Sequence, residues 1–148
     1  MGSLISNGGG ELPSRLVESV KGHEGRRLRA YRDSRGVWTI GYGTNLQKLE
    51  IDEKTAIKWL IRELHRARKG IEKQPGFAEA SLVRQDVLTE CAYQLGVYGL
   101  LRFRNMWAAV AAHDWHTAAL EMLNSKVARF QAPERWAVLA ERMRSGEW

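Results

Sequence analysis

The sequence predicts a mainly helical α+β fold, with a small β segment near the N-terminus and helices over most of the remaining length. Two observations favour this class. Alternation of apolar and polar residues, rich in β-branched and aromatic side chains, is confined to residues 28–43. Elsewhere apolar residues recur at the three- and four-residue spacing of one helix face. The 148 residues make about one domain, and the single cysteine, Cys91, lies among apolar residues and is expected in the core.

The first ten residues, MGSLISNGGG, are small and rich in glycine. We therefore expect a flexible leader or linker over residues 1–10 and a folded domain over residues 11–148. A short helix should begin near Pro13, which suits a first helical turn and is followed by apolar residues at helical spacing. Gly22 and Gly25 mark its expected end.

Residues 28–43 predict a β-hairpin whose turn lies at residues 33–36. Together with the first helix, this hairpin forms a small N-terminal lobe of about residues 11–50. A long linking helix is expected over about residues 52–73, because Asp52 is a suitable N-cap and apolar residues recur on one face of the segment.

The remaining sequence, about residues 77–148, predicts an all-helical C-terminal lobe. An i, i+4 apolar stripe ends at Gly96 and consists of Val83, Val87, Cys91 and Leu95. Further helices are expected over residues 106–112, 115–123 and 133–143. Two lobes joined by a helix leave a cleft between them, and clefts are the usual sites of ligands.

The charge balance is a further signal, since 23 Lys and Arg against 17 Asp and Glu give a formal charge of +6. Such an excess favours a polyanionic partner, whether nucleic acid, a membrane surface or an acidic polysaccharide. The basic run at residues 58–69 is either a solvated helix face or a surface that attracts anionic polymer. The longest apolar run, residues 106–112, is far shorter than the ~20 residues that span a bilayer, and the N-terminus shows no signal-peptide pattern. We therefore expect no stable membrane insertion.

Three polar residues of the N-terminal lobe are expected to meet. Glu24 falls at the end of the first helix, Asp33 at the hairpin turn and Thr39 on the returning strand. Glycoside hydrolysis needs one carboxyl group to protonate the leaving oxygen and an ionised partner to orient water or stabilise positive charge. Taken alone, such a pair is more often two ordinary surface carboxylates, with Asp33 serving only the turn.

The string around these residues resembles the phage-type (T4-like) lysozyme family, glycoside hydrolase family 24. The family signature is a Glu, eight intervening residues, an Asp, five intervening residues and a Thr, within E-G-x-x-L-x-x-Y-x-D-x-x-G-x-x-T-I-G-x-G. Ten positions match in register: Glu24, Gly25, Leu28, Tyr31, Asp33, Gly36, Thr39, Ile40, Gly41 and Gly43. Similar landmarks continue through Tyr93-Gln94-Leu95-Gly96, Phe103-Arg104-Asn105 and Pro133-Glu134-Arg135, so the resemblance covers roughly residues 12–148.

The resemblance implies a two-lobed lysozyme fold and muramidase activity. The reaction is hydrolysis of the β-1,4 bond between N-acetylmuramic acid and N-acetylglucosamine in bacterial peptidoglycan, without metal or cofactor. Glu24 would be the general acid, and Asp33 and Thr39 would position the attacking water, giving inversion at the anomeric carbon.

The resemblance also implies supporting residues. Arg135 occupies the place of an arginine that pairs with the catalytic Glu, and Tyr93 and Gln94 match positions that line the saccharide cleft. From their places on the hairpin, Trp38 and Tyr31 are further candidates for substrate contact.

Two departures from the family pattern stand out. Thr44 replaces a frequent His, so the ion pair that this His makes is absent. The usual Ser-Arg-Trp is Ser125-Lys126-Val127, followed by what reads as a one-residue insertion before Pro133. We expect these departures to change local contacts and not the three catalytic residues.

Two other function classes stay open at this point. One is a catalytically inactive, wall-binding virion module, against which the intact catalytic residues count. The other is a basic nucleic-acid-binding helical domain, although no reading helix, RNA-binding strand motif or zinc-finger spacing is present. His113 and His116 have a spacing that suits zinc, but no third ligand is near in sequence, so no metal is expected.

The expected partner is therefore peptidoglycan and not nucleic acid, and the domain is expected to be a monomer. Two locations fit a muramidase of this family. An endolysin would stay in the host cytoplasm until its release to the periplasm and cell wall, whereas a structural lysozyme would travel in the virion tail.

Overall fold

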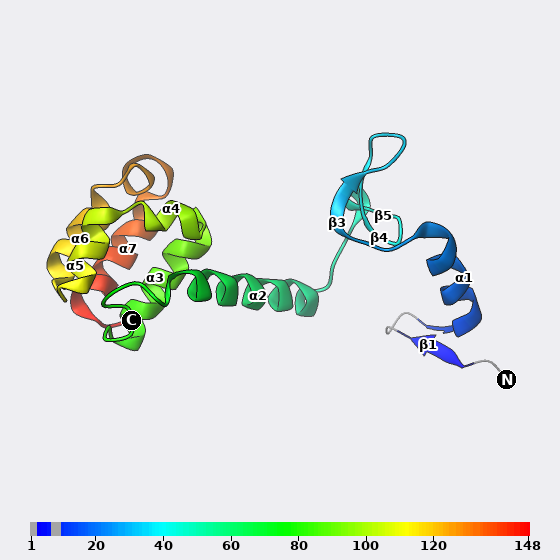
Figure 1. Cartoon of the computed structure of the whole chain (residues 1–148), viewed down its shortest axis with the longest axis horizontal. Coiled ribbons are helices and arrows are strands. Elements are labelled where there is room, and N and C mark those ends of the chain that lie inside the picture. Colours follow the sequence, from blue (N-terminus) through cyan, green and yellow to red (C-terminus); the bar gives the residue numbers. More distant parts are fainter. Residues whose placement is uncertain (1–2, 7–9) are drawn as a thin grey trace. The chain divides into compact units, whose positions relative to one another are not determined.

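The computed structural model describes residues 3–6 and 10–148, which fall into two compact units (Figure 1). Unit 1 runs to Asp52, and unit 2 comprises Glu53–Trp148. Helices predominate in the described part of the chain, and its two small antiparallel sheets both lie in unit 1. The mainly helical α+β class is confirmed.

Unit 1 begins with a strand pair that no sequence pattern predicted. β1 (Leu4–Ser6) pairs antiparallel with β2 (Glu11–Pro13), placing Ile5 opposite Leu12. Residues 4–6 thus form a strand, although they lie inside the leader expected over residues 1–10. Residues 1–2 and 7–9 of that leader lie outside the described residues. Strands of three residues are too short to show a period, so backbone pairing alone reveals them.

The expected N-terminal helix is confirmed as α1 (Ser14–Glu24). It follows Pro13, whose backbone is extended, and it ends at Gly25 with φ of 69°. This left-handed backbone region favours glycine, which is why the helix stops there. No α1 side chain is buried.

The predicted hairpin is confirmed within a sheet of order β3-β4-β5. Its strands are β3 (Arg27–Arg32), β4 (Trp38–Gly41) and β5 (Thr44–Asn45), followed by the short helix η1 (Leu46–Lys48). Tyr31 pairs with Thr39 across the hairpin. The N–H of Asp33 donates to Val37 O over 3.0 Å, and the N–H of Gly36 donates to Asp33 O over 2.9 Å, which closes the predicted turn. Residues 28–43 are therefore not the only β segment, because β5 and the β1–β2 pair extend beyond them.

Unit 2 is helical throughout its regular structure. Its elements are α2 (Glu53–Ile71), α3 (Leu82–Leu95), α4 (Val97–Leu101), α5 (Arg104–Ala111), α6 (Trp115–Leu123), η2 (Val127–Gln131) and α7 (Pro133–Ser145). The helices expected at residues 106–112, 115–123 and 133–143 are α5, α6 and α7, and the expected long helix is α2. The sequence did not predict α4 or η2.

The core of unit 2 lies among α3, α5, α6 and α7, which Figure 1 shows packed together. Its fully buried large side chains include Leu88, Met106, Met122, Trp136 and Met143. The apolar stripe of α3 supplies Val87 and Cys91, so the expected core position of Cys91 is confirmed. Burial raises the pKa of the Cys91 thiol well above its ordinary value, which makes it an unreactive core side chain.

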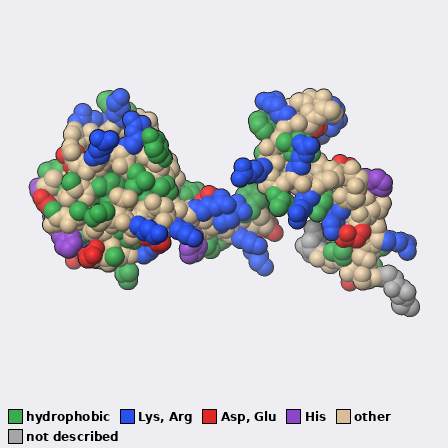
Figure 2. Space-filling model, viewed as in Figure 1, with side chains coloured by type: hydrophobic (Ala, Val, Ile, Leu, Met, Phe, Trp, Pro, Cys, Tyr) green, Lys and Arg blue, Asp and Glu red, His purple; other side chains and the backbone are tan. Residues whose placement is uncertain are grey.

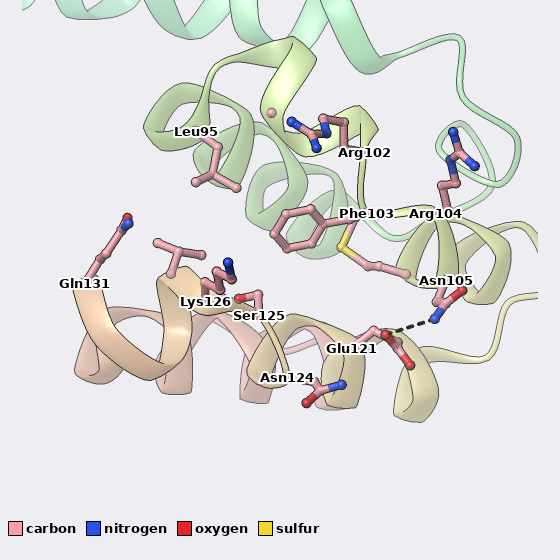
Figure 3. Close-up of a pocket in the computed structure, with 13 residues that line it drawn as sticks. Leu95, Arg102, Phe103, Arg104, Asn105, Glu121, Asn124, Ser125, Lys126 and Gln131 are labelled. Carbon is pink, nitrogen blue, oxygen red and sulfur yellow. Dashed lines mark hydrogen bonds between the residues drawn. The ribbon is translucent and has the colours of Figure 1, made fainter.

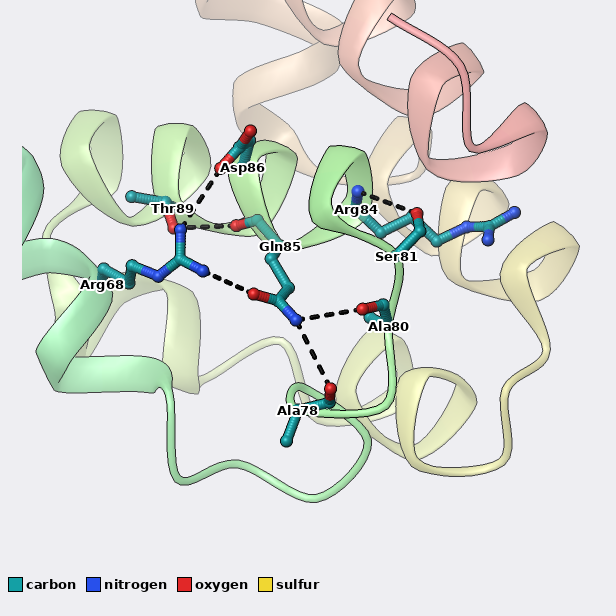
Figure 4. Close-up of polar contacts among 8 residues, drawn as sticks. All are labelled: Arg68, Ala78, Ala80, Ser81, Arg84, Gln85, Asp86 and Thr89. Carbon is teal, nitrogen blue, oxygen red and sulfur yellow. Dashed lines mark hydrogen bonds and ion pairs between the residues drawn. The ribbon is translucent and has the colours of Figure 1, made fainter.

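A polar network joins α2 to α3 and to the loop between them (Figure 4). The Arg68 guanidinium donates to Gln85 Oε1 and pairs with Asp86 over 3.3 Å. Gln85 Nε2 in turn donates to the carbonyl oxygens of Ala80, over 3.0 Å, and Ala78, over 3.4 Å. These bonds fix the loop that carries the chain from α2 into the core helix α3.

The segment η2 is one turn of π-helix, in which the N–H of Ala132 donates to Val127 O over 2.9 Å. It lies in the segment before Pro133 in which a one-residue insertion was expected. A π-turn holds one residue more per hydrogen-bonded turn than an α-helix, which agrees with that expectation.

Candidate active site

Glu24 is the last residue of α1, and its side chain is exposed. Its carboxylate lies against the backbone of Gly43, in the two-residue turn between β4 and β5. The carboxylate forms no hydrogen bond or ion pair with another described residue. Helix α1 and the β4–β5 turn therefore place an unpaired carboxyl group at the edge of unit 1.

Asp33 occupies the hairpin turn, where its side chain is 22% exposed. Its Oδ1 accepts the N–H groups of Val37, over 2.8 Å, and Arg35, over 2.9 Å. Its Oδ2 lies 3.5 Å from an Arg35 guanidinium nitrogen. These contacts, the hydrogen bond from Val37 above all, hold the pKa of the Asp33 carboxyl below its ordinary value. Asp33 thus stabilises the turn and favours its ionised form, and its role in glycosidase chemistry stays a prediction.

Thr39 is the one buried residue among those described in unit 1, with 4% exposure. Its hydroxyl donates to Val37 O over 3.0 Å, so its oxygen lone pairs remain able to accept a hydrogen bond. Val37 therefore joins two predicted site residues, because its N–H binds Asp33 and its carbonyl binds Thr39. The sequence did not point to Val37, since its contribution is made by backbone atoms that any residue carries.

Trp38 and Tyr31 flank this arrangement on neighbouring strands. Trp38 is 43% exposed, and the Arg32 guanidinium lies 4.8 Å from the centre of its ring. The Arg27 guanidinium lies 4.5 Å from the centre of the Tyr31 ring. Both aromatic side chains thus lie beside cations on the hairpin, and their contact with substrate stays a prediction.

Unit 2 brings two predicted residues together, Tyr93 and Arg135. The Arg135 guanidinium pairs with Glu90 Oε1 at 2.8–2.9 Å. Both residues line a cavity of about 480 Å³ whose walls are Leu60, Ile61, Leu64, His65, Arg68, Asp86, Thr89, Glu90, Tyr93, Arg135 and Trp148. Arg135 therefore has a carboxylate partner on α3, and its pairing with Glu24 stays a prediction.

Gln94 has a different environment from Tyr93. Its Oε1 accepts the indole N–H of the fully buried Trp136 over 3.0 Å. The amide oxygen thereby satisfies a polar group in the core. Contact of Gln94 with a saccharide stays a prediction.

A second cavity of unit 2, of about 530 Å³, has a mixed apolar and polar lining with three cationic side chains, and the sequence did not predict it (Figure 3). Arg102, Arg104 and Lys126 contribute positive charge, and Asn105 donates to Glu121 over 3.5 Å. Further lining residues are Leu95, Gly99, Phe103, Met106, Asn124, Ser125, Val127 and Gln131. Amide and cationic side chains suit hydroxyl and carboxylate groups of a ligand. Three segments singled out in the sequence supply lining residues, but no sequence signal placed them around one cavity; they contain Leu95, Phe103-Arg104-Asn105 and Ser125-Lys126-Val127.

A metal-binding cluster and a membrane-spanning helix are both absent from the described residues. Within residues 3–6 and 10–148, no group of three or more His, Cys, Asp or Glu is placed to hold a metal ion. No helix in the same part of the chain is long and apolar enough to cross a membrane. The His113 ring stacks on Trp115, with 5.5 Å between ring centres.

Comparison with known proteins gives one family and several relatives. A model of the phage lysozyme family matches residues 21–144. The chain is 26% identical over 144 residues to "Probable T4-type lysozyme 1" of Dictyostelium discoideum, covering 77% of this chain and 85% of the relative. It is 25% identical over 132 residues to the "Pre-baseplate central spike protein Gp5" of Enterobacteria phage T4, covering 70% of this chain and 23% of that protein. The matched residues include Glu24, Asp33, Thr39 and Arg135.

Proposed function

Because the chain belongs to the phage lysozyme family and is accordingly a peptidoglycan muramidase, we propose that Glu24, Asp33 and Thr39 carry out its reaction by general acid catalysis with a positioned water. The bond cleaved is the β-1,4 link between N-acetylmuramic acid and N-acetylglucosamine. The observation that carries the proposal is the shared attachment of Asp33 and Thr39 to the backbone of Val37.

Glu24 donates a proton to the leaving glycosidic oxygen. Its carboxyl group is exposed and forms no hydrogen bond or ion pair within the described part of unit 1, so unit 1 leaves it accessible to substrate. Protonation lets the leaving group depart as an alcohol, which avoids the negative charge that would otherwise develop on its oxygen.

Asp33 and Thr39 orient the attacking water. The two backbone N–H groups occupy Asp33 Oδ1, which leaves Oδ2 with only an exposed arginine at 3.5 Å. Because the lowered pKa keeps Asp33 ionised, Oδ2 accepts a proton from water. The Thr39 hydroxyl has its own proton committed to Val37 O, so it accepts the second O–H of the same water. Attack opposite the leaving group inverts the anomeric carbon.

The test is cleavage of purified, outer-membrane-stripped bacterial walls by the whole chain. We expect release of reducing ends, with the α-anomer as the first product by NMR. A β-anomer would make Asp33 a nucleophile and overturn the positioned water. Tight wall binding without new reducing ends would support the inactive wall-binding module, and selective binding of DNA over walls would support the nucleic-acid class.

The place of action is also a proposal. The similarity to a central spike protein supports a lysozyme carried in the virion, and the similarity to T4-type lysozymes fits an endolysin that waits in the host cytoplasm. Immunodetection in purified particles separates the two. A signal in particles supports the virion form, and a signal confined to infected-cell cytoplasm supports the endolysin. We expect the domain itself to elute as a monomer in size-exclusion chromatography.

A further inference from the structure

Gly43 occupies an unusual place in unit 1, because the space beside its Cα holds the end of the Glu24 side chain. A Cβ atom on Gly43 would lie 3.0 Å from Glu24 Oε2, 3.5 Å from its Cδ and 4.0 Å from its Cγ. The first of these distances is shorter than ordinary van der Waals contact between carbon and oxygen. The carboxyl group of Glu24 thus rests where the side chain of any other residue at position 43 would begin.

Other glycines near the site share the backbone conformation of Gly43 but not this contact. Gly43 has φ of 87°, and Gly41, two residues earlier at the end of β4, has φ of 71°. Both angles lie in the left-handed region that side chains disfavour. A Cβ on Gly41 would meet nothing within 4 Å, and the same holds for Gly36. Backbone conformation therefore explains glycine at these three positions, and of the three only Gly43 adjoins the Glu24 carboxylate.

We propose that Gly43 is a positioning residue for Glu24, whose missing side chain leaves the space in which the carboxyl group rests. This inference depends on the proposed role of Glu24 as the general acid. Since the Glu24 carboxylate has no hydrogen bond or ion pair with another described residue, its packing beside the bare Cα of Gly43 is a steric constraint on the end of the side chain.

A methyl group at position 43 would shift the Glu24 carboxyl and leave the surrounding fold in place. The contacting atoms belong to the far end of an exposed, flexible side chain, which relieves the overlap by rotating away. At this distance the carboxyl group must move by a few tenths of an ångström. Since a displacement of about 1 Å at a reacting group lowers a rate by about 10²-fold, we expect a smaller loss here, of about 3- to 10-fold. The expected signature is a loss of rate greater than the loss of stability accounts for.

Gly43→Ala and Gly41→Ala form a matched pair that tests this inference. Both variants place a side chain on a left-handed backbone, so both should lower the melting temperature to a similar extent. Only Gly43→Ala should lower kcat on soluble peptidoglycan fragments, by about 3- to 10-fold, with KM within about twofold of wild type. Equal kcat values for the two variants would overturn the proposal. A wild-type chain without muramidase activity would instead defeat the proposed function itself.

Shortening the acid supplies an independent readout. In Glu24→Asp the carboxyl group is one methylene nearer its backbone and no longer reaches position 43. In the double variant of Glu24→Asp and Gly43→Ala, the loss of kcat should therefore be smaller than the product of the two single losses. In the double variant of Glu24→Asp and Gly41→Ala, the loss of kcat should equal that product. Multiplicative losses for both pairs would show that Gly43 does not act through Glu24.

If Gly43→Ala does not fold, the contact between Glu24 and Gly43 is tested through a variant of Glu24. Glu24→Gln should shift the backbone amide resonances of Gly43 in the NMR spectrum and leave those of Gly36 near their wild-type positions. Unchanged Gly43 resonances would remove the contact on which the inference rests.

Discussion

The two units of this chain are stabilised by different forces. Every buried apolar side chain among the described residues lies in unit 2, between Ala67 and Met143. Among the described residues of unit 1, Thr39 alone is buried, and hydrogen bonds to the backbone set the geometry of the hairpin turn. The proposed catalytic residues therefore belong to the unit whose described residues form no packed apolar core, and the two cavities described above belong to the unit with one.

This difference teaches which substitutions should affect rate and which should affect stability. A core side chain contributes through the apolar area it buries, whereas a hydrogen bond in an exposed turn contributes about 1 kcal/mol. Changes at the site of unit 1 should consequently alter chemistry at little cost in folding. Changes in the core of unit 2 should do the reverse.

The largest expected effect is that of Glu24→Gln on rate. Gln is close to Glu in shape and cannot donate a carboxylic proton, so kcat should fall by about 10²- to 10⁴-fold or more. The melting temperature should stay unchanged or rise, because functional carboxylates often reduce stability. Turnover on purified walls and thermal unfolding give the two values. Full turnover in Glu24→Gln would show that another residue is the acid.

The second effect is that of Trp136→Ala on stability. Trp136 is fully buried, donates to Gln94 and has its ring centre 5.9 Å from that of Phe103. Its loss should cost about 3–5 kcal/mol in the free energy of unfolding by urea. Trp148→Ala is the matched control, since that indole is 68% exposed and its loss should cost below about 1 kcal/mol. Similar costs for the two variants would show that burial in the core of unit 2 does not set the contribution of Trp136 to stability.

Much of the fold was predictable because periodicity and glycine are local signals. The spacing of apolar residues alone predicted the boundaries of α6. Gly25 and Gly96 marked helix ends in the sequence, because glycine is favoured at the positive φ that both residues adopt in the structure. β1 and α4 were not predictable, since three and five residues show no period. The only sequence signal of the π-turn η2 was the apparent one-residue insertion before Pro133.

The residue types of the site were predictable, but their connections were not. The spacing of Glu24, Asp33 and Thr39 is visible in the sequence. The contacts made by the backbone of Val37 and beside the bare Cα of Gly43 are not, because they do not depend on a recognisable side-chain type. The partner of Arg135, Glu90, lies 45 residues away on another helix, and only tertiary structure brings the two together.

The Asp33 carboxylate accepts hydrogen bonds in the turn and also carries a negative charge, and two substitutions separate these functions. Their effects should be intermediate among those predicted here. Asp33→Asn keeps an oxygen that accepts the Val37 and Arg35 N–H groups, so the hairpin should persist in NMR spectra, while kcat falls by about 10²-fold. Asp33→Ala should lose both the rate and the order of the turn. Equal hairpin order in the two variants would show that Oδ1 does not stabilise the turn.

The pH dependence of the turn follows from the same carboxylate. The pKa of Asp33 is lowered in the folded chain from its ordinary value of 3.8. Its ionisation therefore adds stability that is present above pH 3.8 and is lost as pH falls through the lower folded pKa. Hydrogen exchange of the Val37 amide should be slower in wild type than in Asp33→Ala at neutral pH, and the difference should shrink below pH 3.8. A difference that grows in acid would contradict this sign.

The smallest effect concerns the basic face of α2, which lies outside both the site and the core. The helix holds six Lys and Arg against two Glu, and Figure 2 shows cations gathered over it. At 3.6 residues per turn, five of these cations fall within one arc of about 120°: Lys54, Lys58, Arg62, Arg66 and Lys69.

Reversing Lys58, Arg62 and Arg66 to Glu should weaken retention on whole walls several-fold at low ionic strength and have less effect at about 0.15 M salt. Cleavage of short, neutral oligosaccharides should be nearly unchanged, because long-range charge acts on encounter and carries no specificity for the bond. Reversal of the exposed Arg15, Lys48 and Arg129 removes the same charge away from α2 and is the matched control. Equal losses of wall retention in the two triple variants would show that net charge attracts the wall, whereas a loss confined to the α2 variant places that attraction on the helix.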